Sequence, residues 1–65
     1  MKSICIFLAT GFEEVEALFP LDILRRGGLS VKTVSVTGEP AVTGAHGVPV
    51  TADCLIEDLK EEDIE

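Results

Sequence analysis

Basic residues are scarce in this sequence, and their scarcity excludes a large class of partners. Lysine and arginine together number 5 against 12 aspartates and glutamates, which gives a formal net charge of −7. A chain of this sign repels a phosphate backbone, and its one basic pair is Arg25 and Arg26. We therefore expect no nucleic-acid partner.

Long apolar runs are also missing. The longest, Ile4 to Ala9, is far shorter than the ~20 apolar residues that are needed to cross a bilayer. The N-terminus carries one lysine, but no small-residue cleavage site follows a long apolar core. We therefore expect a protein without membrane contact that resides in the cytoplasm.

The residue types that build metal, cofactor and nucleophile sites are few. Cys5 and Cys54 lack the CxxC spacing of zinc and redox sites, so we expect two free thiols and no metal. Neither GxGxxG nor GxxxxGK[ST] occurs, so the sequence predicts no cofactor phosphate site. His46, the single histidine, has no nucleophile elbow beside it, and we expect it in a surface loop.

The hydrophobic content is that of a folded chain. Residues of the apolar types make up 46% of the sequence, which is too many for a disordered segment. A chain of 65 residues allows at most one small domain, which buries only ~60% of the surface that its unfolded form exposes. We therefore expect its fold to need support from outside the chain.

The order of the apolar patterns predicts an α/β fold. Lys2 to Ala9 predicts a strand whose apolar run shows no alternation, as in a central parallel strand that is buried on both faces. Glu13 to Arg26 is helical, with acids at its start, arginines at its end and a stop at Gly27 and Gly28. Ser30 to Val36 is β-branched and predicts a second strand, parallel to the first.

The second half of the chain predicts smaller elements. Ala41 to Thr43 and Val48 to Thr51 flank a glycine-rich turn and indicate a hairpin at the sheet edge. Asp53 is a candidate helix cap, and Leu55 to Leu59 is expected to form short helical turns. An acidic stretch, residues 60–65, ends the sequence where another strand would naturally begin.

These predicted strands and helices are too few to complete a parallel sheet, which must be covered on both faces. The chain supplies one long helix and up to three strands. We therefore expect residues 1–65 to be the N-terminal portion of a single, mainly parallel α/β domain, incomplete in this chain.

Glu16 is the residue whose position makes it a candidate for a role in catalysis. Projection of the helix at 100° per residue places it on one stripe with three apolar side chains: Phe12, Phe19 and Ile23. A carboxyl group on such a face, at the mouth of a parallel sheet, is a candidate acid or hydrogen-bond partner. The alternative is that fraying or a kink at Pro20 turns Glu16 toward water. Glu13 and Glu14 are expected only to stabilise the helix start.

The opposite side of this helix is also apolar, with Leu18, Leu21 and Leu24. One sheet cannot cover both sides. We therefore expect at least one of these leucines to be buried by the rest of the domain or by another subunit, and a homodimer contact is one form of this.

Four stretches of the sequence resemble the DJ/ThiJ/PfpI superfamily. They are residues 6–17 (IFLATGFEEVEA), 20–28 (PLDILRRGG), 34–38 (VSVTG) and 44–53 (GAHGVPVTAD). The resemblance covers nearly the whole chain and is nearest to the subgroup of the human parkinsonism-associated protein and its bacterial relatives. It implies a flavodoxin-like α/β sandwich that is usually a homodimer.

The resemblance also implies a chemistry. In the family an acid after the first strand faces a nucleophilic cysteine on a later strand-to-helix turn, and Glu16 matches that acid. The cysteine would come from outside this chain, in the C-terminal remainder of the domain. Members are described as cofactor-free glyoxalases or deglycases that act on small aldehydes such as methylglyoxal or on their protein adducts. The resemblance thus implies a cysteine-dependent enzyme, or alternatively a non-enzymatic oxidative-stress sensor or chaperone.

Overall fold

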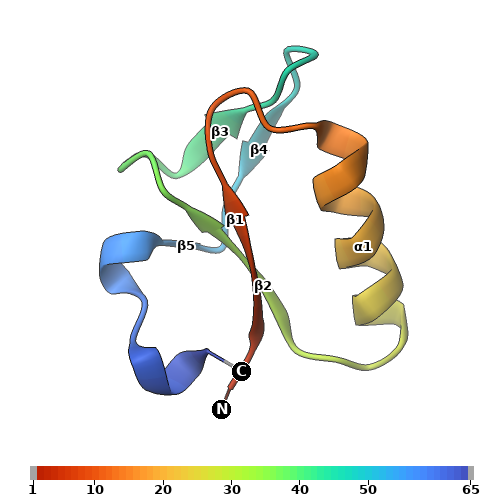
Figure 1. Cartoon of the computed structure of the whole chain (residues 1–65), viewed down its shortest axis with the longest axis vertical. Helices are drawn as coiled ribbons and strands as arrows, with labels where there is room; N and C mark the ends of the chain where they lie inside the picture. Colours follow the sequence, from red (N-terminus) through yellow and green to blue (C-terminus); the bar gives the residue numbers. More distant parts are fainter. Residues whose placement is uncertain (1, 65) are drawn as a thin grey trace.

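A computed structural model describes residues 2–64 as a parallel sheet, a long helix and a separate hairpin (Figure 1). The elements in chain order are β1 (Ile4–Leu8), α1 (Glu14–Arg26), β2 (Val31–Ser35), β3 (Ala41–Thr43), β4 (Pro49–Thr51), β5 (Cys54–Leu55) and the 3-10 turns η1 (Ile56–Asp58) and η2 (Glu61–Asp63). The main sheet has the order β1-β2-β5 with every pairing parallel. The predicted α/β class with a parallel sheet is therefore confirmed.

The ends of α1 follow from its sequence. The Glu13 side chain caps the helix by accepting hydrogen bonds from the backbone N–H groups of Val15 and Glu16, at 2.7 and 3.1 Å. The chain leaves the helix through Gly28, whose φ of 86° favours glycine. The helix is continuous through Pro20. Among the described residues, no helix is long and apolar enough to span a bilayer.

The prediction that β1 is buried on both faces is wrong for this chain. Strand β1 lies at one edge of the sheet and pairs only with β2, in the part of the chain that the structure describes. Leu8 is fully buried in the core cluster against which Ala17 of α1 packs, whereas Phe7 is 50% exposed. Successive side chains on a strand point to opposite faces, and α1 covers only the face of Leu8.

The predicted hairpin is confirmed and sits over the carboxyl end of β1. Strands β3 and β4 are antiparallel, and the buried Val42 packs with Leu8 and Ala52 to form the small core. The hairpin is tied to the loop that follows β1, because Gly11 N–H donates to the Thr43 carbonyl at 2.9 Å. The loop between β1 and α1 thereby lies beside the hairpin (Figure 1).

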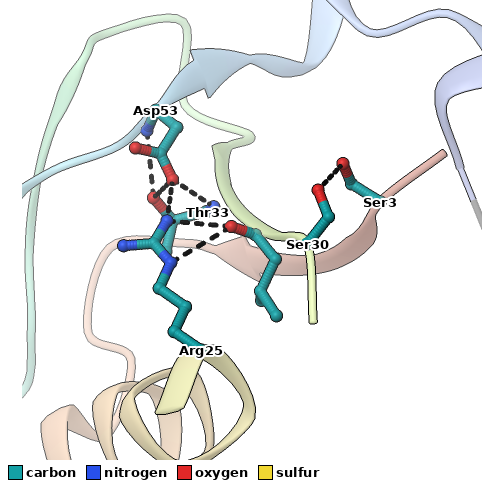
Figure 2. Close-up of polar contacts among 6 residues, drawn as sticks. Ser3, Arg25, Ser30, Thr33 and Asp53 are labelled. Carbon is teal, nitrogen blue, oxygen red and sulfur yellow. Dashed lines mark hydrogen bonds and ion pairs between the residues drawn. The ribbon is translucent and has the colours of Figure 1, made fainter. Parts of the chain in front are cut away.

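The sequence suggested that Asp53 caps a helix, but the structure does not show this. Asp53 is instead the centre of a polar cluster with Arg25 and Thr33, which we call the polar corner (Figure 2). Its carboxylate accepts hydrogen bonds from the backbone N–H and hydroxyl of Thr33, at 2.8 and 3.1 Å, and pairs with Arg25 at 2.9 Å. Arg25 also donates to the Val31 carbonyl at 2.8 Å. These contacts hold the chain beside β2, so Cys54–Leu55 forms strand β5. The helical turn predicted within Leu55 to Leu59 follows directly, as η1.

The electrostatics of this corner follow from the same contacts. Burial tends to raise the pKa of Asp53, but the hydrogen bonds from Thr33 and the charge of Arg25 outweigh it and lower that pKa. Nearby, the hydroxyl groups of Ser3 and Ser30 are joined by a hydrogen bond of 2.7 Å (Figure 2). The corner links the end of α1 to β2 and β5.

The prediction of which helix face packs on the sheet is wrong, although Phe12 of the predicted stripe, just before the helix, does pack against the core. The stripe that faces the sheet is buried or half-buried and consists of Glu14, Ala17, Leu18, Leu21 and Leu24. Phe19 and Ile23 are 63% and 50% exposed, and Glu16 is exposed as well. The helix takes this rotation because the hairpin turn binds the Glu14 side chain, which faces inward at the helix start.

Candidate functional site

The candidate site lies where the β1–α1 loop, the first turn of α1 and the turn between β3 and β4 meet. Its ionisable side chains are Glu13, Glu14 and Glu16 at the helix start and His46 in the hairpin turn. This place is the carboxyl edge of the parallel sheet, where open α/β folds bind their ligands. Ala45 N–H donates to the Phe12 carbonyl at 2.8 Å and holds the turn against the loop.

Glu14 is the buried carboxylate of this site, with an exposed fraction of 7%. Its Oε2 accepts hydrogen bonds from the backbone N–H groups of His46 and Val48, at 2.8 and 3.3 Å. Its Oε1 lies 2.8 Å from Nδ1 of the His46 ring. Glu14 therefore joins the helix to the hairpin, a role beyond the helix-start stabilisation predicted from sequence.

One sequence signal points to this role. Gly44 is buried against the Glu14 side chain, and a Cβ atom built at Gly44 would lie 2.8 Å from Glu14 Cγ and in closer contact with its carboxylate. Only glycine leaves room for that carboxylate. A glycine at this turn position therefore marks a close approach, which periodicity alone does not reveal.

The contact between Glu14 and His46 shifts the pKa values of both side chains. The hydrogen bond from the His46 ring lowers the pKa of Glu14 from 4.5 to about 2; burial opposes the shift, and the backbone N–H groups add to it. The hydrogen bond and charge of Glu14, with the charge of Glu13, raise the pKa of His46 above 6.5. His46 lies in a surface loop, as predicted, with a side chain that is 70% exposed.

These shifts predict that the hairpin docks most firmly between about pH 4.5 and 6.5. The contribution of Glu14 is complete above 4.5 and is lost as the pH falls toward 2, because its folded pKa is the lower one. The contribution of His46 is complete below 6.5 and is lost as the pH rises through its raised pKa. Hydrogen exchange at the Val48 amide across this range measures the docking.

A His46→Gln variant serves as the control for this prediction. It removes the titrating ring but keeps the backbone donor to Glu14, so protection should no longer fall on the alkaline side. An alkaline loss of the same size in this variant would contradict the assignment to His46.

Glu16 stands apart from the other two glutamates. Its side chain is exposed, so the predicted burial on an apolar stripe is not found within this chain. Of the described residues, none donates a hydrogen bond to its carboxylate or forms an ion pair with it.

The two cysteines, Cys5 and Cys54, are free thiols, as predicted. The Sγ atom of Cys5 contacts the Ser3 carbonyl at 3.8 Å.

The site also groups three side chains that can bind metals. Glu13, Glu14 and His46 each present one donor atom, and these atoms all lie within 4.8 Å of one another. The arrangement therefore offers two kinds of chemistry: an uncommitted carboxyl group at Glu16 and a mixed carboxylate and imidazole cluster next to it.

Similarity to known proteins was found at the levels of sequence and fold. The sequence model of the DJ-1/PfpI family matches residues 2–65. The Arabidopsis thaliana protein DJ-1 homolog B is 38% identical over 60 residues, which cover 92% of this chain and 14% of the plant protein.

Two solved structures share the fold. A cysteine-to-alanine mutant of a DJ-1 superfamily protein from Salmonella typhimurium is 41% identical, with a TM-score of 0.84 over 89% of this chain and 31% of that one. Oxidised Toxoplasma gondii DJ-1 is 36% identical, with a TM-score of 0.84 over 89% of this chain and 32% of that one. The chain thus spans about a third of these solved structures. By its sequence and its fold, it belongs to the DJ-1/PfpI family.

Proposed function

We propose that residues 1–65 form the N-terminal portion of a single cysteine-dependent, cofactor-free α/β enzyme domain. Its substrates are reactive aldehydes such as methylglyoxal or their protein adducts. Glu16 is the acid beside a nucleophilic cysteine that the C-terminal remainder of the domain supplies. We refer to this chain together with that remainder as the complete domain. Family membership supports the proposal, and so does the position of Glu16 at the carboxyl edge of the sheet.

The observation that carries the proposal is that three neighbouring glutamates differ in their hydrogen-bond partners. Glu13 caps the helix and Glu14 binds the hairpin turn, so both carboxylates have structural partners. Glu16 is exposed, and its carboxylate has no partner among residues 2–64. It is therefore the one acid of the three that is available to a group outside this chain.

The chemistry requires the reactive form of the cysteine. The thiolate, not the thiol, adds to an aldehyde carbon, and the carbonyl oxygen takes up a proton as the new bond forms. A carboxylic acid at position 16 that donates a hydrogen bond to the sulfur favours the thiolate. The exposed stripe of α1 offers the face on which the remainder of the domain can bury this group.

The test of the proposal is turnover of methylglyoxal by the complete domain. We expect loss of methylglyoxal that depends on the cysteine and slows by about 10²-fold or more when Glu16 is replaced by alanine. Cysteine oxidation that depends on Glu16, without any turnover, would instead favour the alternative of a non-enzymatic stress sensor. Turnover that is unchanged in Glu16→Ala would reject Glu16 as the acid.

We also propose that the outer face of α1 contacts a second copy of the protein. A shallow groove of about 330 Å³ lies where this face borders the inward stripe: Val15 and Phe19 are exposed, Leu18 is half-buried, and Glu14 and Asp22 flank them. Val15 and Phe19 are 68% and 63% exposed and line the same groove. Apolar residues scattered singly over a surface need no explanation, whereas a contiguous apolar patch indicates a contact site. A symmetric dimer would bury this groove against its own copy.

Replacing Phe19 with glutamate is expected to raise the dimer dissociation constant of the complete domain about tenfold or more, because an aromatic contact becomes a charge. Within residues 2–64 the Phe19 side chain is 63% exposed, so the substitution loses little packing there. Sedimentation equilibrium measures the dimer, and Phe19→Leu, which stays apolar, is the control. A dissociation constant that is the same in Phe19→Glu and Phe19→Leu would place the dimer contact elsewhere.

A further inference from the structure

We propose that Glu13, Glu14 and His46 bind a divalent transition-metal cation of the Zn²⁺ type, which joins the start of α1 to the β3–β4 turn. The sequence alone predicts no metal, because neither cysteine has the spacing of a zinc site. The three donors come instead from segments 32 residues apart, which only the fold brings together. The site involves neither Glu16 nor the cysteine, so it goes beyond the proposed enzymatic function.

The hydrogen bonds of the two carboxylates leave one oxygen of each facing the imidazole. Glu13 Oε1 accepts from the backbone of the first helical turn, while its Oε2 lies 3.6 Å from His46 Nδ1. Glu14 Oε2 accepts from the backbone of the hairpin turn, while its Oε1 lies 2.8 Å from the same nitrogen. A cation can therefore use three donors without breaking any of the backbone contacts that position them.

The spacing of these donors suits a small cation. Zinc binds nitrogen and oxygen donors at about 2.0–2.2 Å in tetrahedral geometry, which holds neighbouring donor atoms roughly 3.3 Å apart. The separations of the two carboxylate oxygens from His46 Nδ1, 2.8 and 3.6 Å, lie on either side of that value. Binding replaces the Nδ1 proton, and the neutral imidazole becomes a ligand.

The environment supplies both rigidity and access. Glu14 is held in place with an exposed fraction of 7%, whereas the His46 side chain is 70% exposed, so solvent and cations reach the ring. The imidazole favours Zn²⁺ or Co²⁺, because Ca²⁺ and Mg²⁺ prefer sets of oxygen ligands. Three protein ligands leave a fourth position for water or for a donor from a partner.

The experiment titrates Zn²⁺ into the complete domain after all cysteines have been alkylated, so thiolates cannot bind the metal. Two variants each remove one ligand. Glu13→Gln keeps a side-chain oxygen for the helix cap, and His46→Gln keeps the backbone donor to Glu14. The control is Glu57→Gln, which removes one charge in η1. We expect Zn²⁺ to bind about 10–100-fold more weakly in the two ligand variants than in wild type and the control.

A second readout separates binding at this site from a general effect on folding. Zn²⁺ should raise the unfolding temperature of wild type and Glu57→Gln, but not that of Glu13→Gln or His46→Gln. Without metal, both ligand variants should unfold cooperatively. Equal Zn²⁺ affinity in all four proteins, or no binding to wild type, would overturn the proposal. Neither result bears on methylglyoxal turnover, so the metal site and the proposed enzymatic function fail separately.

Discussion

Replacing Gly44 with alanine is expected to destabilise the complete domain by about 1–3 kcal/mol, because the new methyl group overpacks the contact with Glu14. The Glu14 carboxylate must then move away and lose its hydrogen bonds to the backbone N–H groups of His46 and Val48. Urea unfolding measures the change. The hairpin should loosen first, which hydrogen exchange at the Val48 amide reports.

A double-mutant cycle tests the cause of this destabilisation. In a Glu14→Ala background the obstructing carboxylate is gone, so Gly44→Ala should cost little more. The control is Gly27→Ala, since φ at Gly27 is −77° and the added Cβ would meet only ordinary contacts at 3.4 Å or more. If the effects of Gly44→Ala and Glu14→Ala on the free energy of unfolding are additive, Gly44 acts through something other than Glu14.

Shortening the Glu16 side chain by one methylene is expected to reduce the reactivity of the cysteine more than replacing its carboxyl group with an amide does. Glu16→Asp withdraws the carboxyl group from the sulfur, and a displacement of ~1 Å can cost about 10²-fold in rate. Glu16→Gln keeps both the reach and a hydrogen-bond donor. The pH dependence of cysteine alkylation in the complete domain should therefore shift toward the pKa of a free thiol, ~8.5, most strongly in Glu16→Asp.

Asp22→Asn is the matched control for this experiment. Asp22 is another exposed acid of α1, and its pairing with Arg26 at 3.1 Å contributes only a few tenths of a kcal/mol. Its replacement should leave the thiol titration as in wild type. If the thiol titrates identically in wild type, Glu16→Gln and Glu16→Asp, the catalytic assignment of Glu16 is wrong.

The local pattern of the sequence was enough to predict most of the secondary structure. Continuous apolar and β-branched runs predicted β1 and β2 and their parallel pairing. Acids, arginines and glycines predicted both ends of α1, and the glycine-rich turn predicted the hairpin of β3 and β4. These features depend on backbone propensity and capping, which act within a few residues. The same stretches of sequence also carried the resemblance that the comparisons confirmed.

The tertiary structure alone decided which side chains these elements bring together. Periodicity defines the stripes of a helix but not its rotation, and the inward stripe of α1 includes Glu14 because the hairpin turn binds it. Strand β5 forms because Thr33 and Arg25 hold Asp53 beside β2, which no pattern at residues 53–59 reveals. Glu14 and His46 meet across 32 residues. Contacts over such separations depend on the packing of the whole fold, so sequence reasoning proposed Glu16, near the helix start, and missed the role of Glu14.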